Sequence, residues 1–169
     1  MVHDEDLLLT VLNSAPVVDE TRTEELAGQT GRVISAHFGG TGEEDELDRL
    51  RRMRDALHDV IRGRNDAITR LDALLRDAVL VPEATATGIQ WELRAPANQR
   101  LALRTAQAWS HVSAVTPGRL RACANVACNR FLVDHSRPGT ARWCSMATCG
   151  NRMKVRAHAS RRRAAENEN

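Results

Sequence analysis

The chain has 169 residues, of which 42% are hydrophobic and 27% are charged, which is enough for a buried core and excludes a disordered tail. No apolar run approaches the ~18 residues of a membrane-spanning helix, and the first residues are acidic, so we expect no signal peptide, no membrane partner and a cytoplasmic location. The net charge of +2 is unevenly divided, because residues 1–117 hold 13 Arg against 19 Asp and Glu (net −6), whereas residues 118–169 hold 11 Arg and Lys against 3 Asp and Glu (net +8).

Periodic apolar residues predict helices over residues 23–38, from about 44 to 62, over 65–78 and from Pro96 through Val112. The second helix has the clearest pattern, with a capping box expected from Thr41 and Glu44 and a C-cap at Gly63. The side chains expected to face the core are Leu47, Leu50, Met53, Leu57, Val60 or Ile61, Ile68, Leu71, Leu74, Leu75, Leu101, Ala102, Ala106, Trp109 and Val112.

Two short strands, residues 79–81 and 88–94, are expected to form a small hairpin between the last two of these helices. Trp91 lies in the second strand, and its size favours a place in the core. The turn residues Thr116, Pro117 and Gly118 coincide with the change from acidic to basic composition. The sequence therefore predicts a mainly α protein with an α-rich domain over residues 1–117 and a second domain over 118–169.

Four cysteines are concentrated in the second domain. Four residues separate Cys123 from Cys128, four separate Cys144 from Cys149, and fifteen lie between the pairs. Thiols stay reduced in the cytoplasm, so this spacing indicates one tetrahedral zinc site rather than disulfides. Four thiolates close the coordination sphere, so the zinc is expected to be structural, and His135 is interpreted as a loop histidine rather than a ligand.

The residues around these cysteines predict the architecture of the finger. Residues 129–134 and 141–143 are interpreted as two strands joined by a turn at Pro138 and Gly139, and Ser145 as the N-cap of a helix that continues to about residue 165. A hairpin followed by a helix that carries the last ligand is typical of treble-clef-like fingers.

The run from Arg142 to Arg152, followed by Lys154 and Arg156, resembles the CGNR zinc finger, whose name spells residues 149–152. The upstream Asp134-x-Ser136-Arg137 and both cysteine spacings are also similar to that family. One departure is Ala141, where that family commonly has another arginine. The resemblance implies a stress-responsive transcription regulator with an N-terminal ABATE-like domain that binds a ligand.

The basic residues of the finger are the candidates for nucleic-acid binding, because no carboxylate offsets them between residues 151 and 165. They are Arg130, Arg137, Arg142, Arg152, Lys154, Arg156, His158, Arg161, Arg162 and Arg163. A merely solvated basic face is the alternative, and for Arg152 a structural role is equally open. Asn151 is interpreted as bonding the knuckle backbone, and Gly150 as permitting close approach of the backbone to the metal site.

The leading hypothesis is a zinc-dependent regulator that binds double-stranded DNA, with a small-molecule effector bound between helices of the first domain. Asn13, Arg54 and Trp91 are candidates for the effector site. The alternative is a finger that binds RNA or another protein. No phosphate-binding glycine loop, nucleophile elbow or open metal site occurs in the sequence, so we expect no enzymatic activity. The sequence leaves the oligomeric state open.

Overall fold

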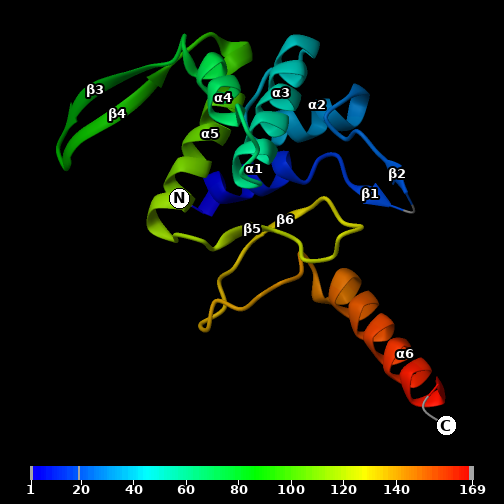
Figure 1. The fold of residues 1–169 in the computed structure, drawn as a ribbon. Coiled ribbons are helices and arrows are strands. Elements are labelled where there is room, and N and C mark those ends of the chain that lie inside the picture. Colours follow the sequence, from blue (N-terminus) through cyan, green and yellow to red (C-terminus); the bar gives the residue numbers. More distant parts are fainter. Residues whose placement is uncertain (1, 19, 168–169) are drawn as a thin grey trace.

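The computed structural model describes residues 2–18 and 20–167, and it has a mostly helical N-terminal region followed by a β-hairpin, a four-cysteine cluster and a helix (Figure 1). The helical region contains, in chain order, α1 (Val2–Leu12), β1 (Val17–Val18), β2 (Thr21–Arg22), α2 (Gly28–His37), α3 (Glu44–Ile61), α4 (Ala67–Leu75), β3 (Val79–Thr85), β4 (Gly88–Arg94) and α5 (Ala97–Val115). The C-terminal part contains β5 (Leu120–Ala122), β6 (Phe131–Val133), the π-helical turn η1 (Met146–Gly150) and α6 (Asn151–Asn167). Within the described residues, no helix is both long and apolar enough to span a bilayer.

The core of the helical region lies between α1, α3 and α5. Helix α3 presents Leu47, Leu50, Met53 and Leu57 to this core, as their spacing predicts, and all four are buried. Helix α5 contributes Leu101, Ala102, Ala106 and Val112, with Trp109 packed at the edge. The third contributor, α1, is not expected from the sequence, because its apolar residues Leu7 to Leu9 are consecutive rather than spaced by a helical turn.

The ends of α3 agree with the sequence only in part. Gly63 has a φ of 65° directly after the C-cap residue Arg62, which is the conformation that favours glycine at the end of a helix. The expected capping box is wrong, because the N-cap is Glu43 and no side chain caps the helix. The hydroxyl of Thr41 instead accepts a hydrogen bond from the backbone N–H of Glu43 at 3.2 Å.

Two other expectations for the helices need correction. Helix α2 begins at Gly28 rather than at residue 23, because the backbone N–H groups of Thr23 and Glu25 bond to the carbonyls of Pro16 and Ser14 in an extended segment. Ile68, expected to face the core, is 65% exposed on α4. The short α4 buries Leu71, and the side of the helix that carries Ile68 faces solvent.

The hairpin of β3 and β4 projects away from the helices (Figure 1). It is longer than expected at β3, which runs to Thr85. Trp91 was expected to lie in the core, but it is 63% exposed on this hairpin. The reason is tertiary: nothing in the described chain covers the hairpin, so a large apolar side chain on it remains in solvent.

The finger hairpin differs from the expected one. Strand β6 pairs with β5, which lies upstream of the first cysteine, with Leu120 opposite Val133 and Ala122 opposite Phe131. Residues 141–143 do not form a strand. They are held by single hydrogen bonds, from Ala124 N to Arg142 O and from Ala141 N to a carboxylate oxygen of Asp134.

The finger shares its core with the helical region. Phe131 is 1% exposed and belongs to the same cluster of buried residues as α1, α3 and α5, and Leu120, Ala122 and Val133 pack against that cluster. The connection between the two parts is short, since α5 ends at Val115 and β5 begins at Leu120. The division into domains at residues 117 and 118 stays a prediction.

Candidate metal centre and nucleic-acid interface

The sulfur atoms of Cys123, Cys128, Cys144 and Cys149 converge at one point, all within 4.8 Å of one another. The Sγ of Cys144 lies 3.7 Å from that of Cys128 and 3.8 Å from that of Cys149. A tetrahedral zinc site with sulfur at about 2.3 Å has sulfur–sulfur edges of about 3.8 Å. All four thiols are free of disulfides, so the geometry fits a closed site of four cysteines for one structural Zn²⁺.

Hydrogen bonds from the surrounding chain hold the sulfurs in place. The buried amide of Asn125 donates to Cys149 Sγ at 3.5 Å, and the backbone N–H of Cys144 donates to Cys123 Sγ at 3.5 Å. Burial raises the pKa of the Cys128 and Cys144 thiols. Thiols this close do not all ionise unaided, and a zinc ion would supply the positive charge that keeps them deprotonated.

The loop between the two cysteine pairs is organised by Asp134, which is buried. One carboxylate oxygen accepts from the backbone N–H and the hydroxyl of Ser136 at 2.9 and 2.6 Å, and the other accepts from Ala141 N and from Arg121, both at 2.9 Å. The hydrogen bonds from Ser136 hold the pKa of Asp134 below its ordinary value. The Asp-x-Ser motif therefore shapes this loop, while Arg137 is exposed.

His135 stands apart from the cysteines. Its Nε2 lies 2.6 Å from a carboxylate oxygen of Glu5 on α1, and the side chain is exposed. The metal-ligating group in the described residues is made of the four cysteines. This arrangement agrees with the interpretation of His135 as a loop residue and gives it a contact to the helical region.

The residues after the last cysteine have identifiable local roles. Ser145 caps the following turn, since its hydroxyl accepts from Thr148 N at 3.3 Å, as expected. Asn151 donates to the carbonyl of Ala147 at 3.3 Å, which supports its structural role in the knuckle. A Cβ on Gly150 would lie 3.0 Å from the Met146 side chain and 3.3 Å from Trp143. The close approach at Gly150 is therefore made by these two side chains and not by the metal site that the sequence suggested, and a Cβ there would make them shift by a few tenths of an ångström.

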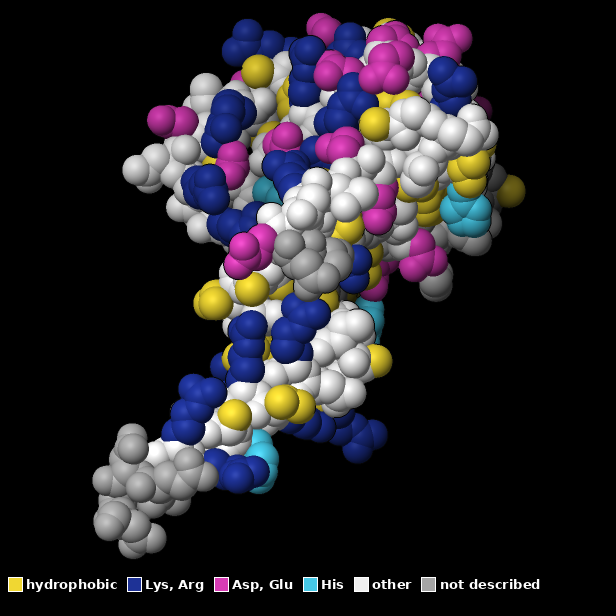
Figure 2. Space-filling model, turned by 90° about the vertical axis from the view of Figure 1, so that its right-hand side faces the viewer, with side chains coloured by type: hydrophobic (Ala, Val, Ile, Leu, Met, Phe, Trp, Pro, Cys, Tyr) yellow, Lys and Arg dark blue, Asp and Glu magenta, His cyan; other side chains and the backbone are white. Residues whose placement is uncertain are grey.

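Seven of the ten basic residues proposed for nucleic-acid binding lie on α6, and the other three lie in the finger before it. Those of α6, from Arg152 to Arg163, are exposed along the projecting helix, and Figure 2 shows positive side chains along its length, whereas both signs mix on the helical region. Arg130 is half-buried, and the guanidinium of Arg142 lies 5.3 Å from the ring centre of Trp143.

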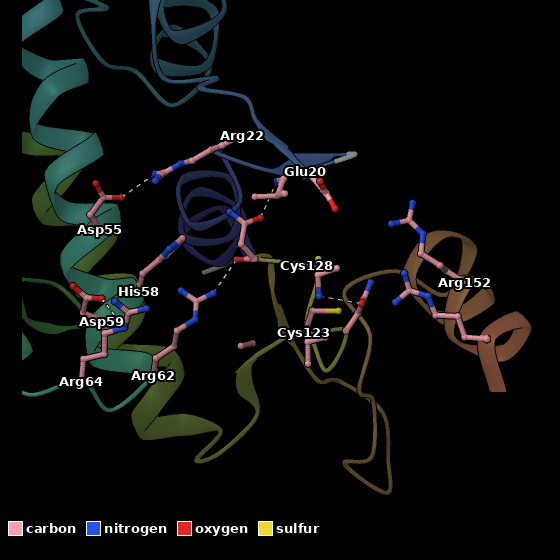
Figure 3. Close-up of a pocket in the computed structure, with 17 residues that line it drawn as sticks. Glu20, Arg22, Asp55, His58, Asp59, Arg62, Arg64, Cys123, Cys128 and Arg152 are labelled. Atoms are coloured by element: carbon pink, nitrogen blue, oxygen red, sulfur yellow. Dashed lines mark hydrogen bonds and ion pairs between the residues drawn. The ribbon is translucent and has the colours of Figure 1, made fainter. Parts of the chain in front are cut away.

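An open cleft of about 1160 Å³ separates α6 from the helical region. Arg152 and Arg156 line one wall, the knuckle from Cys123 to Asn129 lines the floor, and Arg62 and Arg64 near the end of α3 line the opposite wall (Figure 3). Arg62 and Arg64 are basic site residues that the sequence analysis missed, because their pattern is that of an ordinary solvated helix end.

Three carboxylates line this cleft: Glu20 is exposed between β1 and β2, and the other two form ion pairs with arginines of the helical region. Asp55 contacts Arg22 and Arg54, and Asp59 contacts Arg64 at 3.3 Å and Arg70 at 2.6 Å. Among the described residues, no carboxylate forms an ion pair with Arg62, Arg152 or Arg156. A zinc tetrathiolate would carry a charge of about −2 beside them. Arg152, next to the cysteines, can therefore balance that charge as well as contact a ligand.

Two asparagines fasten the finger to the helical region. The amide of Asn13 accepts a hydrogen bond from Phe131 N at 2.7 Å and donates to Phe131 O at 3.2 Å. The amide of Asn129 accepts from Val17 N at 3.0 Å and donates to Ala15 O at 2.6 Å. Each amide thus pairs with a backbone N–H and a backbone carbonyl, as the backbone of a neighbouring strand would. The sequence analysis missed the contacts of Asn129 with Val17 and Ala15, since the position of Asn129 next to Cys128 marks it only as part of the finger.

The three effector candidates lie in different places. Asn13 is engaged with the finger, whereas Arg54 is buried and bonds to Ser14, Glu24 and Asp55 at 3.1, 2.8 and 2.9 Å. Trp91 lies on the projecting hairpin. The structure does not bring the three together, and their role in effector binding stays a prediction.

The geometry defines a class of protein: a helical region that carries a four-cysteine zinc finger. Residues 119–162 match the family model of the CGNR zinc finger, so the chain contains a CGNR zinc finger domain over those residues. A comparison with curated proteins gives no match. The matched segment is about a quarter of the chain, and the ABATE-like character of the helical region stays a prediction.

Proposed function

We propose that this protein is a DNA-binding transcription regulator in which zinc holds α6 for contact with duplex DNA. The observation that carries the proposal is the placement of α6. Cys149 ties its beginning to the metal cluster, and beyond it the exposed face carries arginines and no carboxylate as far as residue 165. A helix of this width fits the major groove, where arginines neutralise phosphates and reach guanine edges.

The cleft strengthens the electrostatic argument. Arg62 and Arg64 face α6 across it, and because Arg64 is paired with Asp59 at 3.3 Å, the guanidinium that this wall offers without a carboxylate partner among the described residues is that of Arg62. A polyanion following α6 would pass the guanidinium of Arg62, which has planar donors suited to phosphate. Binding would then depend on the two parts being held together as well as on the finger.

The regulatory role is proposed for the helical region. The resemblance to ABATE-like domains supports an effector site there, and the shared core gives that region a direct mechanical connection to the finger through Phe131. We propose no catalytic activity, because the candidate metal site is a closed one with four thiolates. A response to stress is part of the same proposal.

Selection from random duplex DNA with the zinc-loaded protein tests the proposal directly. The selected duplex then serves to compare the wild type with a variant carrying Arg156→Ala and Arg163→Ala, which removes two exposed charges beyond the cysteines. A matched control carries Arg76→Ala and Arg94→Ala, two exposed arginines of the helical region that contact Asp72 and Glu92.

We expect the α6 variant to keep its zinc and to lose most of its DNA affinity, with a plot of log affinity against log salt shallower by about two units. The control should retain the wild-type slope. Unchanged affinity in the α6 variant, or no enrichment in the selection, would contradict DNA binding. Preferential binding of single-stranded RNA or of protein would support the alternative function of the finger.

A further inference from the structure

The hairpin of β3 and β4 has one continuous apolar face. Side chains alternate between the faces of a strand, and Leu80 pairs with Leu93, Pro82 with Trp91 and Ala84 with Ile89. These six residues define the apolar ribbon face. The opposite face carries Val79, Val81, Glu83, Thr85, Gln90, Glu92 and Arg94, most of them polar.

Most of the apolar ribbon face is uncovered, and Leu93 at its root is half-buried. Leu80 is 48% exposed, Ile89 69% and Trp91 63%, and Figure 1 shows the hairpin projecting from the helices with no other part of the described chain packed over it. Together the six side chains expose roughly 500 Å² of apolar surface, as large as the patches that mark interaction sites on soluble proteins. A two-stranded ribbon alone is also marginally stable in water, so a covering layer would stabilise it.

The root of this face opens into a second cleft, of about 600 Å³, between the hairpin and the helices. Leu93 of the ribbon lines it together with Ala108 and Val112 of α5. Ala108 and Val112 are buried, and the rest of the lining is polar or charged (Asp4, Glu5, Arg104, Gln107 and His111), so the exposed apolar surface ends at the root of the ribbon.

We infer that the apolar ribbon face binds the same face of a second copy of this chain, forming a two-fold symmetric dimer. None of its six residues is ionisable, so two copies can meet without like-charge repulsion and without selecting a charged partner. Two faces of roughly 500 Å² bury about 1,000 Å² in total, which reaches the lower limit of a specific interface.

The sequence also favours face-to-face packing over addition of strands edge to edge. Proline has no N–H to donate, so Pro82 fits β3 only where its nitrogen points away from β4, toward the outer edge of the hairpin. That edge therefore lacks a donor at its centre. A second copy gains more by covering Trp91 and Ile89 than by extending the sheet at β3.

Sedimentation equilibrium of the full-length, zinc-loaded protein between about 1 μM and 1 mM tests the inference, since weak symmetric interfaces of this size dissociate within that range. The disrupting variant carries Ile89→Ser and Trp91→Asp. The matched control carries Val79→Ser and Gln90→Ser, which alter exposed residues of the opposite face of the same two strands. We expect a monomer–dimer equilibrium in the wild type, at least a tenfold weaker one in the disrupting variant, and little change in the control.

Zinc content and circular dichroism establish that each variant is folded. If the double variant fails to fold, Ile89→Ser alone at the exposed end of the ribbon serves instead and should weaken dimerisation in the same direction. A wild type that is monomeric throughout the range, or a dimer that the disrupting substitutions leave intact, overturns the inference. Binding of the monomer to phosphatidylcholine vesicles through Trp91 in place of self-association would also overturn it.

Discussion

The side chain of Asn13 forms two hydrogen bonds with the backbone of Phe131, 118 positions away in the chain, accepting from N–H at 2.7 Å and donating to the carbonyl at 3.2 Å. Both backbone groups are removed from solvent with the fully buried Phe131 ring between the helices and the finger. The pair is therefore one of the links between the acidic and the basic parts of the protein.

We expect Asn13→Ala to lower the free energy of unfolding by about 2 kcal/mol, because it leaves a buried donor and a buried acceptor without partners. Urea denaturation measures the loss, and hydrogen exchange at the Phe131 amide locates it. Asn98→Ala is the matched control, since the Asn98 amide bonds to Asp45 in an exposed position. Equal effects of the two substitutions would show that the link contributes nothing beyond an ordinary surface contact.

Removal of one zinc ligand should have a local structural effect. The wild type is expected to bind one zinc per chain, and Cys144→Ser to bind none under the same conditions. A finger of this size has too small an apolar core to fold alone, so on its own it would be expected to unfold completely without zinc. Because Phe131 is anchored in the helical core, we now expect β5 and β6 to stay protected from hydrogen exchange while the knuckle and the beginning of α6 lose protection.

His135→Ala is the control for the metal prediction, because His135 contacts Glu5 rather than the cysteines. It should retain one zinc by elemental analysis. Full zinc content in Cys144→Ser, or loss of zinc in His135→Ala, would show that the ligand set is wrong.

His58 should make the stability of the protein depend on pH. Burial lowers its pKa to about 4, and its Nε2 lies 2.7 Å from the carbonyl of Leu12. In the unfolded chain the pKa of histidine is near 6.5. Between pH 6.5 and 4 the unfolded state is therefore protonated at this residue while the folded state is not. His58 thus stabilises the fold fully above pH 6.5, and about 3 kcal/mol is lost as the pH falls to 4.

The measurement is the free energy of unfolding from pH 7 to 4 for the wild type and for His58→Gln, at equal free zinc. Zinc ligands are the same in both proteins, so the difference between the curves isolates His58. The same substitution at exposed His111 controls for the loss of a histidine. Parallel curves for wild type and His58→Gln would contradict the assignment.

The fragment of residues 1–117 should remain helical but be less stable than the whole chain. It retains α1, α3 and α5, but it lacks Phe131, whose loss from a core costs about 3–5 kcal/mol. Circular dichroism with thermal melting tests this, and Phe131→Ala in the full chain should show a similar loss. A fragment without helical structure would place the helices and the finger in one folding unit.

The cysteine spacing was sufficient to predict the metal centre, because ligand type and spacing are local properties. Four clustered cysteines in a reducing environment commonly bind one metal ion. The same holds for α3 and α5, whose apolar side chains recur at the helical period. The expected basic helix after Ser145 is likewise present as η1 and α6. In each case the determining residues lie within a few turns of one another.

Only the tertiary structure decided which strand pairs with β6, where Trp91 lies and which way Arg152 faces. Strand pairing and burial depend on residues far apart in the chain, and a local pattern does not say whether another element arrives to cover a side chain. Residues 129–134 have strand character whichever partner they take, and Trp91 has the same neighbours in sequence whether covered or exposed. The contacts of Asn13 and Asn129 with backbone more than 110 positions away arise only when the helices and the finger fold against each other, since an amide pairs with any backbone that tertiary packing brings to it.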